Sequence, residues 1–357
     1  MPSPNKAVVA CAGSGKTTRI VEQALSDDQK KVLIVTYTNE NLLQIKEKLL
    51  ELSGEIPSHI SIQSWFTFLF QEGCRPYLNS KLPDRRLRSI YYFKQSDNAL
   101  MTRLRRTPER QAAHYLTSSG LIYEDKLSKL AFRCNQESGG LVVERLGRIY
   151  DQIFIDEAQD LEGWDYDLVG ELLGGPADLT LVGDPRQKIL KTHRASKNRG
   201  FNTVFDWLNA NRSDEFDLVE DLSTWRCVQA ICDVADQLFP NLPNTTSLND
   251  NGTDHDGVFF VRAGEVQNYF ETHQPIVLRH NRREKAAGLS ALNIGVAKGR
   301  TYVRVLIFPT RPMLEYLRTG DPSVAGDRCR LYVALTRAQQ SVTFVVPDDF
   351  EPFEAWA

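Results

Sequence analysis

A glycine-rich segment near the start of the chain has the residue types and spacing of a phosphate-binding loop. Residues 10–17 read ACAGSGKT, follow an apolar run and precede a plausible helix. Glycines let backbone N–H groups close on phosphates at a helix N-terminus, where the helix dipole favours anions. Lys16 suits the β- and γ-phosphates of ATP and Thr17 suits Mg²⁺, whereas an ordinary glycine-rich turn would not require Lys-Thr at this offset. The expected nucleotide contacts in the loop are Ala12, Gly13, Ser14, Gly15, Lys16, Thr17 and Thr18.

An acidic pair follows a second apolar run in the segment IFIDEAQD, residues 153–160. Asp156 is suited to hold Mg²⁺ through water, and Glu157 to orient or deprotonate an attacking water molecule. The same two residues could instead form a helix N-cap with an acidic first turn. Because the phosphate loop is also present, we favour the metal-binding and catalytic interpretation.

Composition and charge restrict the class of protein that carries these motifs. The 357 residues have room for about two domains, and 41% hydrophobic with 25% charged residues is ordinary for a globular protein. No apolar run reaches the ~20 residues of a membrane span, and no signal peptide precedes the first motif. We therefore expect a cytoplasmic protein without a membrane partner. The net charge of −3 means that any nucleic-acid surface must be a local patch.

The six cysteines are scattered along the chain and include no C-x-x-C pair. Zinc and iron–sulfur sites usually show such pairs, so we expect no structural metal. Reduced thiols are the expected state.

Short apolar runs of strand type alternate with helical stretches, which is typical of parallel α/β sheets. Parallel strands need crossover helices, and the spacing of the runs provides them. The expected strands lie at residues 7–11, 32–37, 60–62, 153–156 and 179–183, and then at 258–261, 276–278, 303–308 and 342–346. Residues 240–257, rich in Pro, Asn and Thr, are expected to form a long surface loop.

The alternation stops between residues 75 and 147, where the sequence indicates a mostly helical insertion. Tyr91, Tyr92 and Phe93 lie among its basic residues. The segment could extend a DNA-binding track, or it could be a solvated helix face with core aromatics. Eight basic side chains are concentrated between positions 85 and 110: Arg85, Arg86, Arg88, Lys94, Arg103, Arg105, Arg106 and Arg110.

Further motifs follow the phosphate loop along the chain, in a fixed order. They are VTYTN at 35–39, SIQSW at 61–65, LVGDPRQ at 181–187, LSTWRC at 222–227, VAKGRTY at 296–302 and LYVALTRA at 331–338. With IDEAQD, this series resembles the motifs of UvrD/Rep-type superfamily 1 DNA helicases, in a minimal form without their large second-lobe insertion. The resemblance runs from position 10 to position 338.

The resemblance implies an α/β fold of two RecA-like P-loop NTPase lobes with parallel sheets. The first lobe would comprise residues 1–74 and 148–214, with the small helical insertion at 75–147 as a DNA contact. Residues 215–357 would form the second lobe. ATP and Mg²⁺ would bind where the two lobes meet.

The resemblance also implies roles for individual residues in hydrolysis. Gln187 would sense the γ-phosphate, and Arg226 and Arg337 would act as arginine fingers, because a planar, permanently charged fork can bridge phosphate oxygens. Trp225 would stack on the base, although a buried core tryptophan is the alternative. The remaining nucleotide contacts would be Lys298 and Gly299.

The contacts to DNA are assigned by the same resemblance. They would come from two motifs of the first lobe and comprise Tyr37, Asn39, Ser64 and Trp65. Tyr37 is the candidate stacking platform.

Three departures from the family pattern affect these expectations. The glutamine segment that reads adenine is missing before the phosphate loop, so GTP or UTP should support hydrolysis within about tenfold of ATP. Leu190 and Thr192 stand where the family has aromatic residues that stack on bases, and His193 would replace them only in part. The interval between Arg226 and Lys298 is too short for the family's large second insertion.

Two functions from different classes remain open. The first is an ATP-dependent translocase or helicase on single-stranded DNA, moving 3′→5′ by resemblance. The second is a nucleotide-gated DNA-binding or signalling subunit that does not unwind and serves a larger complex, with a partner such as a nuclease. The motifs do not distinguish DNA from RNA.

Overall fold

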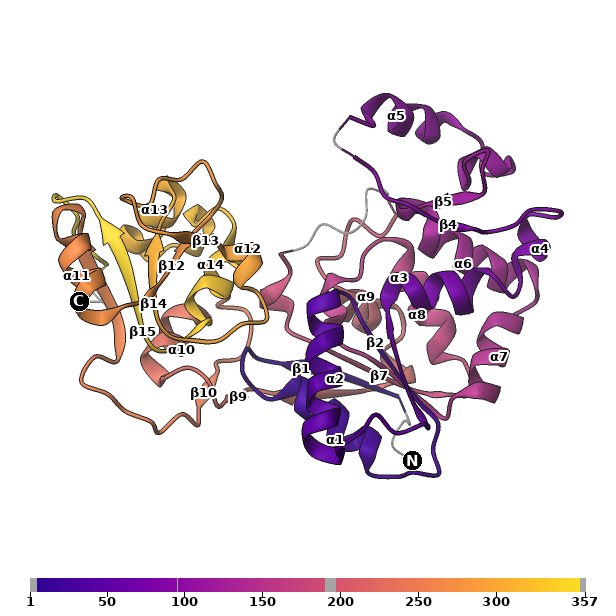
Figure 1. Ribbon diagram of the computed structural model, residues 1–357, viewed down its shortest axis with the longest axis horizontal. Coiled ribbons are helices and arrows are strands. Elements are labelled where there is room, and N and C mark those ends of the chain that lie inside the picture. The colour runs from indigo at the N-terminus through magenta and orange to yellow at the C-terminus, as the bar shows by residue number, and fades with distance from the viewer. Residues whose placement is uncertain (1–4, 95, 190–196, 354–357) are drawn as a thin grey trace. The chain divides into compact units, whose positions relative to one another are not determined.

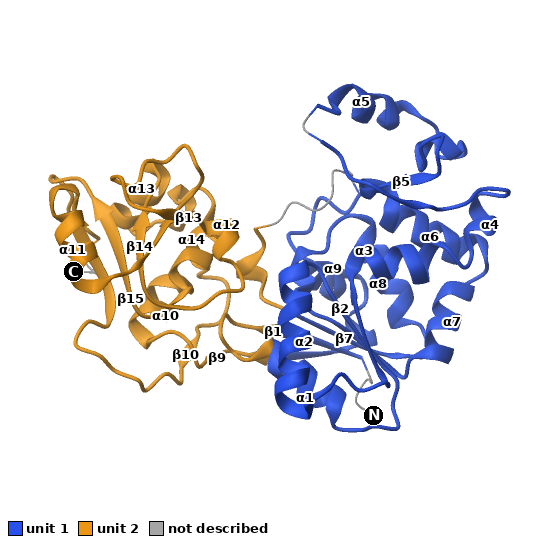
Figure 2. Cartoon of the chain, viewed as in Figure 1, with its two compact units in different colours: residues 1–8, 17–182, 190–219 blue, residues 9–16, 183–189, 220–357 orange. Residues whose placement is uncertain are grey.

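The computed structural model describes residues 5–94, 96–189 and 197–353. The chain divides into two compact units, each assembled from several segments, as Figure 2 shows. Unit 1 comprises residues 1–8, 17–182 and 190–219, and unit 2 comprises residues 9–16, 183–189 and 220–357. The predicted motifs are therefore distributed over both units, and the phosphate loop groups with unit 2.

A six-stranded sheet with the order β3-β2-β6-β7-β1-β8 is the centre of unit 1. In it, β2 pairs in parallel with β3 and β6, and β6 pairs in parallel with β7. Its middle strands are apolar and buried, as expected for a sheet covered on both faces. The strands are β1 Lys6–Ala10, β2 Val32–Thr36, β3 Ile60–Ser64, β6 Gln152–Ile155, β7 Asp178–Gly183 and β8 Asp217–Asp221.

Amphipathic helices connect these strands (Figure 1). The first, α1 (Lys16–Leu25), buries Ile20, Val21 and Ala24, which lie on one face of the helix. The side chain of Thr38 caps α2 (Asn39–Ser53) by accepting a hydrogen bond from Asn41 N–H at 3.2 Å. The other helices around the sheet are α3 Trp65–Phe68, α8 Trp164–Leu173 and α9 Val204–Asn211.

The segment between β3 and β6 is mostly helical, as predicted. It also contains two short parallel strands, β4 (Ser89–Tyr91) and β5 (Leu121–Tyr123). Each of these strands has only three residues, which is too short a pattern to be recognised in the sequence. The helices of this segment are α4 Leu78–Lys81, α5 Asn98–Arg106, α6 Leu127–Glu137 and α7 Leu141–Ile149.

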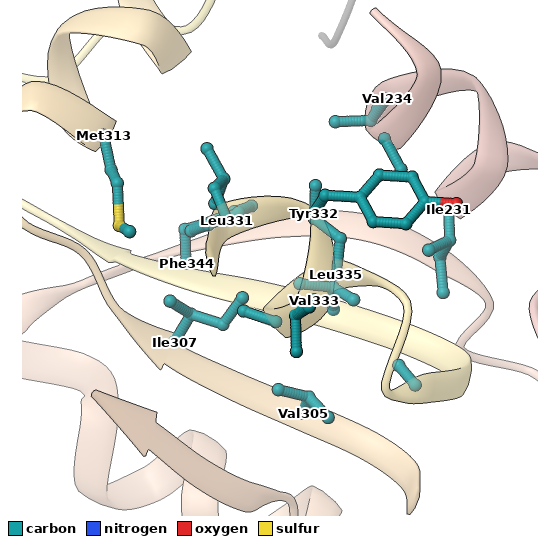
Figure 3. Close-up of a cluster of buried hydrophobic side chains, with 14 of the residues drawn as sticks. Ile231, Val234, Val305, Ile307, Met313, Leu331, Tyr332, Val333, Leu335 and Phe344 are labelled. Carbon is teal, nitrogen blue, oxygen red and sulfur yellow. The ribbon is translucent and has the colours of Figure 1, made fainter. Parts of the chain in front are cut away.

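Unit 2 is built around a five-stranded sheet with the order β11-β15-β14-β12-β13, in which all neighbours are parallel. Its core contains Ile307 and Phe344 of the sheet and also Tyr332 of α14 (Arg328–Leu335), whose ring lies beside Ile231 of α10 (Gln229–Asp236) (Figure 3). The strands are β11 Gly257–Arg262, β12 Ile276–Arg279, β13 Ala291–Asn293, β14 Tyr302–Phe308 and β15 Ala338–Val346. The helices are α10 Gln229–Asp236, α11 Val266–His273, α12 Ile294–Ala297, α13 Arg311–Thr319 and α14 Arg328–Leu335.

The predicted fold class, α/β with parallel sheets and a mostly helical insertion, is confirmed. All nine predicted strands are present, with ends shifted by a few residues at most. The sequence did not indicate β8 or β13, because β8 reads DLVED with exposed middle residues and β13 has three residues. The predicted loop at 240–257 holds only β10 (Thr246–Ser247) before β11 begins, and β10 pairs with β9 (Ser223–Thr224). In the described part of the chain, no helix combines the length and the apolar character that a membrane crossing requires.

Candidate functional site

The phosphate loop after β1 has the backbone shape that its sequence predicts. Gly13 and Gly15 both have positive φ angles, +79° and +84°. Lys16 Nζ donates to the carbonyl oxygens of Ala10 at 3.2 Å and Cys11 at 2.9 Å. The ammonium group is thereby held over its own loop, where it can reach a bound phosphate.

The LSTWRC motif packs directly against this loop within unit 2. Thr224 Oγ1 donates to the carbonyl oxygen of Ala12 at 2.7 Å, and Trp225 N–H donates to that of Gly13 at 3.0 Å. A Cβ atom on Gly13 would lie 2.5 Å from Arg226 Cβ and 2.6 Å from Thr224 Oγ1. Glycine is therefore required at position 13 for space as well as for conformation.

Ser14 supplies a direct test of whether the loop fits a phosphate. Its side chain is 2% exposed, and its hydroxyl has no hydrogen-bond partner among the described residues. A buried hydroxyl without a partner costs free energy, because it has lost its hydrogen bonds to water. A phosphate oxygen bound in the loop would provide the missing partner.

The candidate metal site lies in unit 1, at the end of β6. Thr17 Oγ1 donates to Asp156 Oδ2 at 3.2 Å, and Asp156 is 2% exposed. A hydroxyl and a carboxylate are the hard oxygen donors that Mg²⁺ prefers, so these residues fit that ion. The described residues contain no group of three His, Cys, Asp or Glu side chains suited to hold another metal.

Glu157 has an unusual backbone conformation, with φ at +56° and ψ at +38°. Its N–H donates to Asp156 Oδ1 at 2.9 Å, and Gln159 Nε2 donates to its carboxylate. A left-handed conformation costs a non-glycine residue roughly 1–2 kcal/mol. Such a cost is tolerated mainly where the surroundings fix the residue for a functional reason.

A buried polar network in unit 2 holds Gln187. Its amide Nε2 donates to Asp184 Oδ2 at 2.9 Å, and Arg337 Nη2 donates to its Oε1 at 3.1 Å. Arg186 Nε donates to the other oxygen of Asp184 at 3.0 Å, and Arg186 Nη1 donates to Asp236 Oδ1 at 2.9 Å. The network fixes the Gln187 amide from two sides.

Asp184 is ionised within this network. Burial alone would raise the pKa of its carboxyl group, but the charges of Arg186 and Lys16 and the hydrogen bonds outweigh burial and lower that pKa. The nearby thiol of Cys11 has no such support, and burial raises its pKa to about 12. All six cysteines are free thiols.

The two predicted arginine fingers both lie in unit 2 but differ in burial. Arg337 is 1% exposed, and it also donates to the carbonyl oxygens of Val333 and Arg300, each at 3.2 Å. Arg226 is half-buried, and its Nη1 donates to the carbonyl oxygen of Thr336 at 3.1 Å. The structure thus brings Arg337 to Gln187, and Arg226 to the phosphate loop through Gly13.

Trp225 is 64% exposed, which excludes the alternative of a buried core residue. Its backbone is fixed to the phosphate loop while its ring remains accessible. Lys298 and Gly299, at the end of α12, and Thr18, in the first turn of α1, are half-buried. The nucleotide contacts of these three residues remain predictions.

The predicted DNA contacts fall into two groups. Tyr37, Asn39 and Ser64 lie where β2 and β3 meet the following helices, and each is at least partly exposed. Trp65 is 1% exposed, and its indole N–H donates to Asp165 at 2.8 Å. A ring buried in this way offers no face to a base, so the prediction for Trp65 is corrected to a core role.

Two side chains beside the predicted site, Thr224 and Phe66, were missed in the sequence. Thr224 is recognisable only as a small polar residue within its motif. Phe66 lies 5.6 Å from Tyr37 and 6.1 Å from Tyr92, ring centre to ring centre, and both pairs meet edge to face. Phe66 and Tyr92 are separated in sequence, so only the fold unites the three rings. Leu190, Thr192 and His193, named above for base stacking, lie outside the described residues.

Comparison with known proteins agrees with this picture. Residues 1–193 match the AAA domain family AAA_19. No curated protein matches the sequence. Among solved structures, the chain is similar to arterivirus nonstructural protein 10, a helicase determined with DNA, with 17% identity and a TM-score of 0.50 over 97% of this chain and 61% of that one. It is also similar to the PRRSV helicase, with 16% identity and a TM-score of 0.48 over 98% of this chain and 55% of that one.

The chain therefore spans about three fifths of the length of the arterivirus protein. At this low identity the likeness to nonstructural protein 10 shows the fold alone. The family match is a separate finding, made on the sequence of residues 1–193. The match extends over more than half of the chain, from position 1 through the GDPRQ motif, and the chain belongs to the AAA_19 family of AAA domains.

Proposed function

We propose that this chain is a nucleic-acid-stimulated ATPase of the UvrD/Rep type that moves 3′→5′ along single-stranded DNA. One observation carries the proposal: the phosphate loop is tied to the LSTWRC motif through Thr224 and Gly13. A loop that merely turned the chain would not need this close packing. An AAA-family phosphate loop joined to an arginine-bearing motif is what an NTPase requires.

The residues divide the chemistry between them. Lys16 binds the β- and γ-phosphates, and the free hydroxyl of Ser14 accepts or donates a further hydrogen bond. Thr17 and Asp156 hold Mg²⁺, which supplies charge neutralisation when bound. Glu157, oriented by Gln159, takes the proton of the attacking water.

Charge that develops on the transferred phosphoryl group is met by Arg226 and Arg337. Gln187 accepts a hydrogen bond from Arg337 and donates one to Asp184. When Arg337 binds the phosphoryl group, its hydrogen bond to Gln187 must change. Trp225 offers an accessible ring to the base. Stacking is tolerant of base identity, and this supports the expectation of weak discrimination among nucleotides.

The track for single-stranded DNA follows the exposed end of the unit 1 sheet. The rings of Tyr37, Phe66 and Tyr92 lie next to one another in space, in that order. Stacking of a base on an aromatic ring is worth ~1–3 kcal/mol per base. Phosphate contacts from basic side chains of the insertion would supply affinity without sequence preference.

A second candidate, a nucleotide-gated binding subunit that does not unwind, is favoured by one observation. Residues 227–297 are occupied by the framework of unit 2, from α10 to α12, and provide no separate insertion. We expect poor unwinding by the isolated chain, since opening each base-pair step costs ~1.4 kcal/mol on average. A protein partner, such as a nuclease, would then supply the additional binding to DNA that unwinding requires.

The test is ATP hydrolysis with single-stranded DNA, duplex DNA, RNA or no polymer. Single-stranded DNA should stimulate turnover, Lys16→Ala should abolish it, and Glu157→Gln should bind nucleotide but hydrolyse slowly. Near-normal turnover by Lys16→Ala would refute the site. Separate assays of translocation and strand displacement distinguish the two candidates, since the subunit alternative predicts neither.

A further inference from the structure

A concavity of about 710 Å³ in the inserted segment of unit 1 is lined by four arginines. They are Arg85, Arg86, Arg88 and Arg103. Its volume lies within the range of small-molecule sites, roughly 300–1,000 Å³. A second concavity of about 570 Å³ shares Arg85 and Arg86 with it. The hydrolytic motifs described above lie elsewhere in the chain.

These four arginines have no ion pair with any described residue. Other arginines of the same segment are paired: Arg133 with Glu109 at 2.6 Å, and Arg145 with Glu72 at 2.7 Å. Asp84 is the single acid among the described residues that line the concavity. Positive charge is therefore concentrated here without internal compensation, which is the condition for binding an anion.

Backbone contacts order the part of the chain that carries Arg86 and Arg88. Arg88 N–H donates to the carbonyl oxygen of Gly120 at 2.9 Å, immediately before β4 pairs with β5. A Cβ atom on Gly120 would lie 2.7 Å from the carbonyl oxygen of Arg86, and its φ is +82°. Glycine thus permits the close approach that fixes the arginine segment against the turn. A site organised in advance loses less free energy on binding.

The remaining lining is polar and suits phosphate oxygens. Thr117, Ser118 and Ser119 contribute hydroxyl groups along the turn that faces the arginines. Thr117 Oγ1 is 2.9 Å from Ser119 Oγ and accepts from Leu121 N–H at 3.0 Å, so the turn is ordered. Arginine forks and hydroxyl donors together are the usual means of holding phosphate.

We propose that this arginine pocket is a second anion site that binds a compact oligophosphate group, separate from the phosphate loop. A nucleic-acid backbone spreads single charges along its length. Four guanidinium groups around one concavity instead match several charges on adjacent atoms, as in a diphosphate or triphosphate. Such a group exists on a free nucleotide or polyphosphate, and at the 5′ end of an RNA chain.

The test is calorimetric titration of inorganic tripolyphosphate into the full chain. The wild type should show two binding events, one of which Lys16→Ala removes. Arg86→Gln combined with Arg103→Gln should weaken the other event by at least about tenfold. The matched control combines Arg105→Gln with Arg110→Gln, which removes the same charge from neighbouring exposed positions outside the pocket.

The control pair should change neither affinity by more than about twofold. All replaced arginines are exposed, so each variant should keep its melting temperature, which circular dichroism checks. If Arg86→Gln with Arg103→Gln loses one binding event and keeps the event that depends on Lys16, the second site is supported. The phosphate loop is then tested separately, by Lys16→Ala. If the Lys16 event is missing but the pocket event remains, the proposed function fails and the arginine pocket stands.

Two oligoribonucleotides of one sequence, with a 5′-triphosphate or a 5′-hydroxyl end, separate the sources of the ligand. Better displacement of tripolyphosphate by the triphosphate end identifies an RNA terminus. Displacement by neither oligonucleotide identifies a free ligand. A single tripolyphosphate event that Lys16→Ala removes would overturn the proposal. Equal losses in the pocket and control variants, or equal displacement by both ends, would also overturn it, since each indicates a diffuse backbone-binding surface.

Discussion

Two sets of arginines occupy opposite environments in this chain. Arg186 and Arg337 of unit 2 are 2% and 1% exposed, and their guanidinium groups donate to carboxylate, amide and carbonyl oxygens. Arg86 and Arg103, in the insertion of unit 1, are exposed and have no ion pair among the described residues. The sequence motifs select the first set, whereas composition alone marks the second.

The difference teaches how to interpret an arginine from its surroundings. A buried cation must recover the hydration that it has lost, so its partners in the protein are part of the fold. An exposed cation loses little hydration and can be kept unpaired for a ligand. Replacing a buried arginine should therefore damage both stability and catalysis, and replacing an exposed one should damage binding alone.

The largest effect is expected from Arg337→Ala. Turnover should fall by about 10³–10⁵-fold, because arginine fingers contribute this much to related phosphoryl transfers. Steady-state hydrolysis with saturating single-stranded DNA measures it, and Arg105→Gln serves as the exposed control. Nucleotide affinity and melting temperature must be measured too, since the lost bonds to Gln187 and two carbonyls also weaken the fold. Turnover within tenfold of the wild type would exclude Arg337 as the finger.

Arg186→Met should have the largest effect on stability. It leaves Asp184 and Asp236 buried without their cation, and breaking a buried pair by removing one partner costs about 3–5 kcal/mol. Urea unfolding measures the loss, and Arg105→Met, exposed on α5, should change stability by less than about 0.5 kcal/mol. Equal stability of the two variants would contradict the contrast between buried and exposed arginines.

The framework of the fold was predictable because strand patterning and motif spacing are local signals. Residues 32–35, an uninterrupted apolar run, became the first four residues of the fully buried β2. The phosphate loop was equally predictable, since Gly13 and Gly15 are required by backbone shape. Strands β4, β5 and β13 were not predictable, because three residues give no period to recognise.

The parts of the site that depend on tertiary packing could not be predicted. Trp65 occupies a motif position associated with DNA, yet the fold buries its ring against Asp165. Phe66 and Tyr92 come together only in the folded chain, and no sequence period encodes their contact. Hydrogen bonds such as Arg337 to Gln187 join positions 150 residues apart.

Tyr92→Ala tests the insertion on its aromatic side. Tyr92 is 56% exposed and lies beside Phe66, so it should contribute ~1–3 kcal/mol to binding of single-stranded DNA. Fluorescence anisotropy at two salt concentrations measures the change. Tyr92→Phe keeps the ring and should bind normally. A loss that disappears at high salt would indicate an electrostatic contribution in place of stacking.

The smallest expected effect concerns a paired charge within the insertion itself. Glu109 accepts from Lys129 at 2.8 Å, from Arg133 at 2.6 Å and from the Tyr115 hydroxyl at 3.0 Å. Burial alone would raise the pKa of Glu109, but these hydrogen bonds outweigh burial and lower the pKa from 4.5 to about 2. The carboxylate therefore stabilises the folded state above pH 4.5, and this contribution is lost as the pH falls toward about 2.

Glu109→Gln should consequently lower the melting temperature at pH 7, and the deficit should shrink as the pH is lowered from 5 to 3. Because Glu109 is about one-third exposed, solvent screening limits the contribution to at most about 1 kcal/mol. Arg103→Gln is the matched control from the unpaired set. It breaks no ion pair, so its melting temperature should follow that of the wild type at every pH. An equal deficit of Glu109→Gln at pH 3 and pH 7 would contradict this prediction. It would mean that the ionised carboxylate of Glu109 does not stabilise the fold through Lys129 and Arg133.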